Sequence, residues 1–141
     1  MILHAGLIVP PRPGRSGGVL IAGASGAGKS DLMLRLMDAG WRLVADDRTL
    51  VWVSEGRLFG RAPEPLAGLI EARGLGVIAA PCLSFAEIRL SVRCVPADAV
   101  ERMPPDRRIS VLGVDLPRVE LPGLEASAPL KVARALTHLG L

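Results

Sequence analysis

The chain has 141 residues, half of them apolar, and its 17 Lys and Arg against 14 Asp and Glu give a net charge of +3. This length and composition predict one domain over residues 1–141 with a core of its own. No apolar run approaches the ~18 residues of a membrane span and no signal peptide opens the chain, so we expect a cytoplasmic protein with no membrane partner. The chain is mildly basic but contains no run of Lys or Arg, so we expect no nucleic-acid partner.

Residues 2–9 are expected to form a first strand, and residues 10–18 a Pro- and Gly-rich loop. The apolar run 19–22 predicts a buried strand, and good helix formers after Ser30 predict a helix that ends at Gly40. Between this strand and this helix lies a glycine-rich segment.

That segment, residues 23–30, reads Gly-Ala-Ser-Gly-Ala-Gly-Lys-Ser and matches the P-loop pattern of glycine, four free positions, then Gly-Lys-Ser/Thr. Glycines let successive N–H groups turn inward, and the helix N-terminus adds positive potential, so polyphosphate is bound mostly by main chain. Lys29 would reach the β- and γ-phosphates, and the Ser30 hydroxyl would coordinate Mg²⁺. A glycine-rich turn that merely precedes a helix is the alternative.

A second feature is the strand expected at 41–45, which ends in Asp46 and Asp47. Many nucleotide hydrolases and kinases place a carboxylate beside their metal in this way. Successive strand side chains point to opposite faces, so the two aspartates should not share one task unless the strand ends between them. A turn with two exposed charges remains possible.

The rest of the chain predicts antiparallel hairpins and one more helix. Strands at 50–53 and 58–61 are expected to flank a turn at Glu55-Gly56, and the two cysteines, Cys82 and Cys94, are expected to be buried in or beside strands. The other expected elements are a weak Glu-x-Arg-Gly-x-Gly motif at 71–76, a strand at 88–95, a charged loop at 100–108, a hairpin of 109–112 with 114–121, and a helix at 128–139.

Three blocks, 23–30, 44–48 and 71–76, together resemble the catalytic domain of bacterial HPr kinase/phosphorylase. The resemblance runs from His4 to about Pro122 and suggests the short form without the family's amino-terminal domain. It implies an α/β fold: a P-loop-containing mixed sheet with antiparallel hairpins, similar to phosphoenolpyruvate carboxykinase. It also implies transfer of a phosphoryl group from ATP, with Mg²⁺, to a serine of the phosphocarrier HPr, and a reverse reaction with inorganic phosphate that gives pyrophosphate.

The resemblance also implies roles for single residues. Asp46 corresponds to the catalytic carboxylate, with His4 and a mobile-loop arginine, Arg102, as further catalytic candidates. Ser30, Asp47 and Glu71 would serve the metal. The residues expected to bind the nucleotide are Gly23, Ala24, Ser25, Gly26, Ala27, Gly28, Lys29, Ser30 and Arg73.

Several alternatives stay open at this point. Either Asp46 or Asp47 could take the serine proton, and a homo-oligomer is possible although only one short helix is expected at the carboxy end, where the family uses several to form hexamers. The same residues would suit a P-loop kinase of a small metabolite, or a module that binds ATP without catalysis and signals through a partner. Replacement of Asp46 by Asn separates an enzyme from such a sensor.

Overall fold

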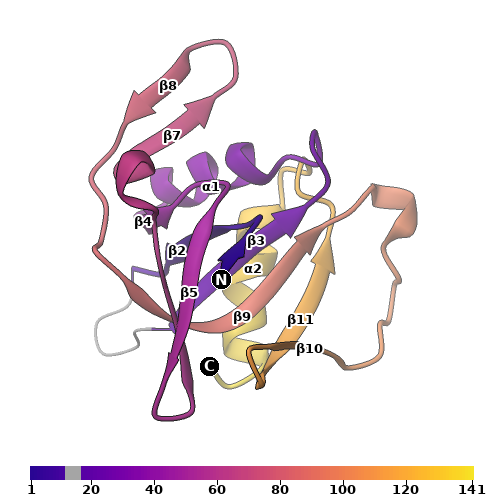
Figure 1. Cartoon of the computed structure of the whole chain (residues 1–141). Coiled ribbons are helices and arrows are strands. Elements are labelled where there is room, and N and C mark those ends of the chain that lie inside the picture. Colours follow the sequence, from indigo (N-terminus) through magenta and orange to yellow (C-terminus); the bar gives the residue numbers. More distant parts are fainter. Residues whose placement is uncertain (12–16) are drawn as a thin grey trace.

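The computed structural model describes residues 1–11 and 17–141, so residues 12–16 of the loop expected at 10–18 lie outside the described residues. The two α-helices of this part of the chain are α1 (Lys29–Asp38) and α2 (Ala128–His138), with short 3-10 turns at Glu64–Leu66 and Ala97–Ala99 (Figure 1). The strands are β1 (Ile2–Leu3), β2 (Gly6–Val9), β3 (Gly17–Gly23), β4 (Arg42–Ala45), β5 (Thr49–Ser54), β6 (Arg57–Arg61), β7 (Leu69–Ala72), β8 (Gly76–Ala79), β9 (Ala86–Cys94), β10 (Arg107–Val111) and β11 (Val114–Leu121).

The described strands form a nine-stranded sheet and a separate two-stranded one. The large sheet has the order β1-β5-β6-β9-β3-β2-β4, and β9 also pairs with β11, which pairs with β10. The β3–β9 and β9–β11 pairs are parallel and the others are antiparallel. The mixed sheet with antiparallel hairpins is therefore confirmed.

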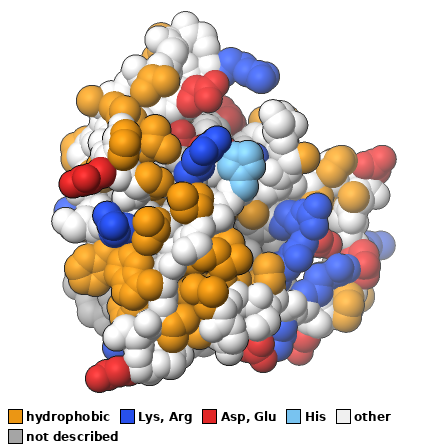
Figure 2. Space-filling view, viewed as in Figure 1, with side chains coloured by type: hydrophobic (Ala, Val, Ile, Leu, Met, Phe, Trp, Pro, Cys, Tyr) orange, Lys and Arg blue, Asp and Glu red, His pale blue; other side chains and the backbone are white. Residues whose placement is uncertain are grey.

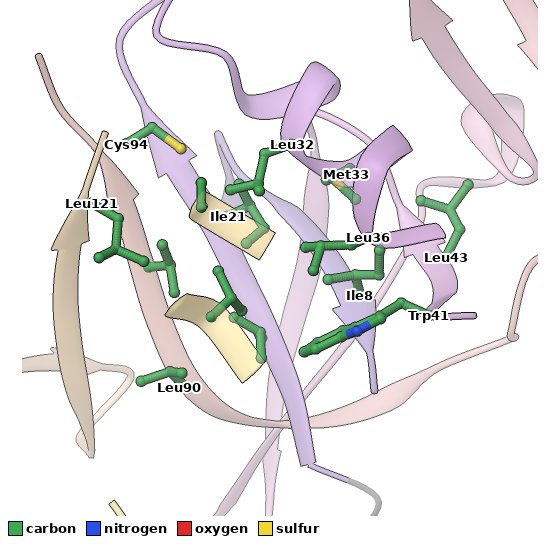
Figure 3. Packing of buried hydrophobic residues seen from close by; sticks show 14 of the residues in the cluster. Ile8, Ile21, Leu32, Met33, Leu36, Trp41, Leu43, Leu90, Cys94 and Leu121 are labelled. Carbon is green, nitrogen blue, oxygen red and sulfur yellow. The ribbon is translucent and has the colours of Figure 1, made fainter. Parts of the chain in front are cut away.

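Two clusters of buried apolar residues hold this sheet. The first joins α1 and α2 to the central strands, and Figure 3 shows Leu32 and Leu36 of α1 converging with Ile8 and Ile21 of the sheet. The second cluster draws on β2, β3, β4, β5, β6, β9, β10 and β11. Each fully buried Leu or Ile contributes roughly 1.5–3 kcal/mol. Because β3 has residues in both clusters, the strand that leads into the phosphate loop is fixed on both of its faces.

Most of the expected elements form where the sequence predicts them. The β5–β6 turn places Glu55 and Gly56 at φ 52° and 73°, as a two-residue hairpin turn requires. Across this hairpin Trp52 pairs with Phe59, and their rings stack with centroids 5.9 Å apart. The β10–β11 hairpin, strand β9 and helix α2 also lie within a few residues of their expected ranges.

Two expectations are wrong. The strand expected at 2–9 is interrupted at His4 and Ala5, because β1 pairs with β5 whereas β2 pairs with β3 and β4. A buried side chain distant in sequence stabilises this break: the Thr49 hydroxyl donates a hydrogen bond of 2.7 Å to the Ala5 carbonyl. Cys94 is buried as expected, but Cys82 is exposed.

The segment at 69–78 forms the hairpin β7–β8, which projects from the body of the molecule beside α1 (Figure 1). Gly74 and Gly76, both glycines of the 71–76 motif, adopt φ of 94° and 95° around its turn. The motif thus builds a tight turn at the tip of a projecting element. Across the described residues, neither helix has the length and apolarity needed to span a bilayer.

Candidate phosphate-binding site

Strand β3 ends at Gly23 and helix α1 begins at Lys29, so the predicted strand, loop and helix context of the P-loop is present. Gly23, Gly26 and Gly28 have φ of 142°, 82° and 94°, a region that residues with a Cβ rarely adopt. The Ala27 N–H donates to the Ala24 carbonyl at 3.0 Å and closes the turn. The loop therefore leads directly into the N-terminus of α1, where unpaired N–H groups favour an anion.

The loop also packs tightly on what lies behind it. A Cβ on Gly23 would lie 2.6 Å from the Cys94 carbonyl oxygen, and one on Gly28 would lie 2.7 Å from a Leu124 methyl carbon. Burial raises the pKa of the Cys94 thiol to about 11, although the charges of Lys29 and Arg35 oppose this shift. Cys94 is thus a neutral packing residue beneath the loop.

Lys29 lies along the inside of the loop. Its Nζ donates to the Gly23 carbonyl at 2.8 Å and is 3.4 Å from the Ala24 carbonyl. These two carbonyls hold the ammonium group at the start of the loop. If a polyphosphate binds, its charged oxygens would replace these neutral carbonyls as acceptors of the Lys29 ammonium and would make stronger hydrogen bonds with it.

Asp46 follows the last residue of β4 and connects three elements of the site. Its Oδ1 accepts from the Ser30 hydroxyl at 3.0 Å, and its Oδ2 accepts from the Glu71 N–H of β7 at 2.9 Å. Burial raises the pKa of Asp46, and the charges of Asp47 and Glu71 add to this effect, while the two hydrogen bonds partly oppose it. The result is a half-buried carboxylate that takes up a proton more readily than a free aspartate does.

Asp47 lies in a different environment. It has a φ of 63°, and the Arg48 N–H turns back to the Asp46 carbonyl at 2.6 Å. The Asp47 carboxylate is 3.5 Å from Nε2 of His4, and both side chains are at least half exposed. Strand β4 ends at Ala45, so both aspartates lie beyond it. Asp46 contacts Ser30 and the main chain of β7, whereas Asp47 contacts His4, so the two carboxylates are suited to different tasks.

The oxygen atoms of Ser30 and Asp46 suit a magnesium ion. Mg²⁺ prefers oxygen ligands at ~2.0–2.1 Å and keeps several waters, and adjacent ligands of such an octahedron lie about 2.9 Å apart. The observed 3.0 Å between Ser30 Oγ and Asp46 Oδ1 is close to this separation. No group of three or more His, Cys, Asp or Glu side chains assembles anywhere in residues 1–11 and 17–141, and Glu71 reaches Asp46 through its main chain.

The two arginines expected at the site lie apart from these contacts. Arg73 is exposed at the turn between β7 and β8, and Arg102 is exposed in the loop that precedes β10. Within the described part of the chain, no hydrogen bond or ion pair joins either guanidinium to the loop at 23–30. The structure thus brings together Lys29, Ser30 and Asp46, and separately His4 and Asp47.

Sequence reasoning did not identify two supporting contacts. One is the Glu71 N–H on Asp46, which no side-chain pattern could reveal. The other is Arg35 of α1, which donates to the Glu125 carbonyl at 2.8 Å and also to the Gly123 carbonyl. Arg35 thereby fixes the segment that packs against Gly28, and its only sequence signal is its i,i+4 spacing from Asp31.

Comparisons with known proteins identify relatives of this chain. The family described as HPr Serine kinase C-terminal domain matches residues 15–132. An HPr kinase/phosphorylase of Clostridium novyi is 35% identical over 123 residues, which are 84% of this chain and 40% of that protein. One of Streptococcus thermophilus is 38% identical over 117 residues, 74% of this chain and 38% of the relative. The chain spans about two fifths of the length of these curated relatives.

A solved structure is also similar. The HPr(Ser) kinase/phosphatase from Coxiella burnetii matches with a TM-score of 0.86 at 27% identity, over 99% of this chain and 96% of that one. This match confirms the predicted fold class, a P-loop mixed sheet of the phosphoenolpyruvate carboxykinase-like kinase type.

Proposed function

We propose that this chain, which belongs to the HPr serine kinase C-terminal domain family, uses ATP to phosphorylate a serine of an HPr-type phosphocarrier protein. The observation that carries the proposal is the cluster of Lys29, Ser30 and Asp46 at the start of α1. This cluster combines a main-chain anion site with a carboxylate that follows β4, two strands away from β3 in the sheet. The printed names of the relatives supply the substrate, and such a partner implies a cytoplasmic protein.

ATP would lie with its phosphates against the N–H groups of residues 23–30, and the Lys29 ammonium would contact the β- and γ-phosphates. Ser30 would hold Mg²⁺, with Asp47 and Glu71 as further candidate ligands, and Asp46 would lie beside the ion as the base. The metal, when bound, neutralises charge on the phosphates. Arg73 and Arg102, both exposed, are available to the phosphate and to the acceptor.

In the transfer step the acceptor serine oxygen bonds to the γ-phosphorus, and the bond from that phosphorus to the β,γ-bridging oxygen breaks. ADP leaves with the bonding electrons, and the serine proton passes to a carboxylate. We assign this base to Asp46, because its pKa is raised by burial, so it accepts a proton more readily. Asp47, 3.5 Å from His4, is the competing base, and its contact with His4 gives that histidine a positioning role.

The same groups would serve the reverse reaction. Inorganic phosphate would attack the phosphorus of phosphoserine, the serine oxygen would leave, and the protonated carboxylate would return the proton. The products are serine and pyrophosphate. A carboxylate with a raised pKa suits both directions because it is readily protonated and deprotonated.

The test is phosphoryl transfer from γ-labelled ATP and Mg²⁺ to purified HPr, with HPr lacking the acceptor serine as the control. We expect label on HPr only when the serine is present. Nucleotide binding without any transfer would favour an ATP-sensing module. Transfer to a small metabolite with HPr unlabelled would identify a small-molecule kinase and reject HPr as the acceptor.

A further inference from the structure

Arg93 lies at the end of β9 that is nearest the phosphate loop. Its register partner on β3 is Ala22, the residue directly before Gly23, and its partner on β11 is Glu120. The next residue, Cys94, pairs with Gly23 itself. Arg93 is therefore one strand away from the first residue of the loop.

The direction of this side chain follows from its neighbours. Cys94 is 2% exposed and belongs to the cluster packed by the helices, so Arg93 projects from the opposite face of β9. On that face Ala22 packs with the second cluster, which includes Ala5. Adjacent strands are about 4.8 Å apart, and an extended arginine is longer than this spacing. An Arg93 side chain that extends toward β3 would meet Ala22, whose side chain is a single methyl group.

Charge distinguishes Arg93 from the other arginines of this face. Arg107 and Arg118 both lie against Glu120, at 3.2 Å and 3.5 Å, and Arg107 also pairs with Glu101. Arg93 is exposed and forms no hydrogen bond or ion pair with any residue in the described ranges. Figure 2 shows Lys and Arg side chains gathered over β9, β10 and β11. Glu120, the register partner of Arg93 on β11, is already paired with Arg107 and Arg118.

His4 and Asp47 lie on the other side of β3, toward β2. Strand β3 lies between β9 and β2, and β2 is preceded by His4, whose ring is 3.5 Å from Asp47. A phosphate beyond the end of β3 would have the His4 and Asp47 pair on one side and Arg93 on the other. Such a phosphate dianion needs a cation outside the loop, because Lys29 is held at its inner side.

We propose that Arg93 binds the phosphate dianion on the acceptor side of the site, either phosphoserine or inorganic phosphate, a role that rests on the proposed function. The planar guanidinium can donate two parallel hydrogen bonds to the non-bridging oxygens. The phosphate in the loop is held by main chain and Lys29, so Arg93 affects the second phosphate and leaves nucleotide affinity unchanged.

The experiment titrates inorganic phosphate into the ADP-bound protein by calorimetry and, in a second arm, phosphoserine-HPr. The variants are Arg93→Gln, Arg93→Lys and a matched control, Arg89→Gln, which removes an exposed arginine four residues earlier on the same strand. We expect Arg93→Gln to raise the Kd of the bound phosphate species about tenfold, Arg93→Lys to restore part of it, and Arg89→Gln to have no effect. The Kd for ADP should stay within twofold in all three.

An effect on inorganic phosphate alone assigns Arg93 to the attacking phosphate of the reverse reaction, and an effect on phosphoserine-HPr alone assigns it to the product. Unchanged affinities in both arms, an equal loss in Arg89→Gln, or no phosphate binding by the parent protein would overturn the inference. If phosphate affinity depends on Arg93 but HPr is never labelled, the proposed function fails, and what stands is a second phosphate site at Arg93 without the acceptor role.

Discussion

The two halves of the site differ in how far the protein organises them before any ligand binds. On the nucleotide side, Lys29, Ser30 and Asp46 are held by hydrogen bonds of 2.8–3.0 Å to the loop, to one another and to the main chain of β7. On the acceptor side, Arg93 and Arg102 are exposed. Under the proposed function, the nucleotide would meet a prepared geometry, whereas the acceptor side would be ordered by its ligand, and that ordering costs conformational entropy.

The largest effect is expected at Asp46. Asp46→Asn removes the proton acceptor, and we expect the rate of transfer to HPr to fall about 10³-fold, within the range for general bases. Nucleotide affinity should change little, because the loop amides and Lys29 remain. The measurement is single-turnover transfer together with a nucleotide titration.

Asp47→Asn is the matched control for Asp46. A larger rate loss in Asp47→Asn than in Asp46→Asn would move the base to the aspartate beside His4. Loss of nucleotide binding in Asp46→Asn would instead show that this carboxylate mainly holds the metal and the loop.

The shape of the loop gives the second prediction. Gly23→Ala places a Cβ 2.6 Å from the Cys94 carbonyl oxygen at a φ of 142°, so we expect the free energy of unfolding to fall by about 3 kcal/mol. Gly26→Ala, at a φ of 82° with no atom within 4 Å of the new Cβ, should cost only about 1 kcal/mol. Urea denaturation compares the two, and equal losses would contradict the close packing of β3 on β9.

The acceptor side gives the third prediction. Arg102 lies in the exposed loop before β10, and loss of one charged hydrogen bond in Arg102→Gln should lower kcat/KM for HPr about tenfold and leave the Kd for ATP unchanged. Steady-state kinetics with varied HPr provide the measurement. A weaker affinity of Arg102→Gln for ATP would mean that Arg102 belongs to the nucleotide side of the site.

The smallest effect is expected at the far end of β9, at Glu87, which has an ion-pair partner, whereas Arg93 has none within residues 1–11 and 17–141. Two hydrogen bonds from Arg57, at 2.9 Å and 2.7 Å, lower the pKa of Glu87 below its ordinary value of 4.5. A lowered pKa contributes stability above pH 4.5 that is lost as the pH falls through the folded-state pKa. Glu87→Gln should therefore lower Tm slightly at pH 7, and this difference should shrink below pH 4.5. A difference that stays constant down to pH 3 would argue against the ion pair.

Local patterns predicted the strand, loop and helix around residues 23–30 well. The glycines of 23–30 and the two-residue turn at Glu55-Gly56 act within a few residues, so the sequence suffices to place them. The apolar strand that ends before Asp46 likewise predicted a carboxylate near the loop, and the contact with Ser30 fits that prediction.

Contacts between distant segments could not be predicted in this way. The break at His4 depends on Thr49, and the second hydrogen bond to Asp46 comes from the main chain of β7. Only the family resemblance placed His4 at the site, and the structure adds its contact with Asp47. The register of β9 beside β3, which places Arg93 next to Ala22, depends on the whole sheet.

The central claim is that a polyphosphate lies against the main-chain amides at the start of α1, with Asp46 beside it. The most direct measurement is a titration of the isotope-labelled protein with ATP and Mg²⁺, followed by the backbone amide resonances, with Lys29→Met as the control. We expect the largest shift changes at residues 24–30, with a further change at Asp46, and much weaker binding in Lys29→Met. Saturable ATP binding that leaves the amides of 24–30 unshifted would contradict the account.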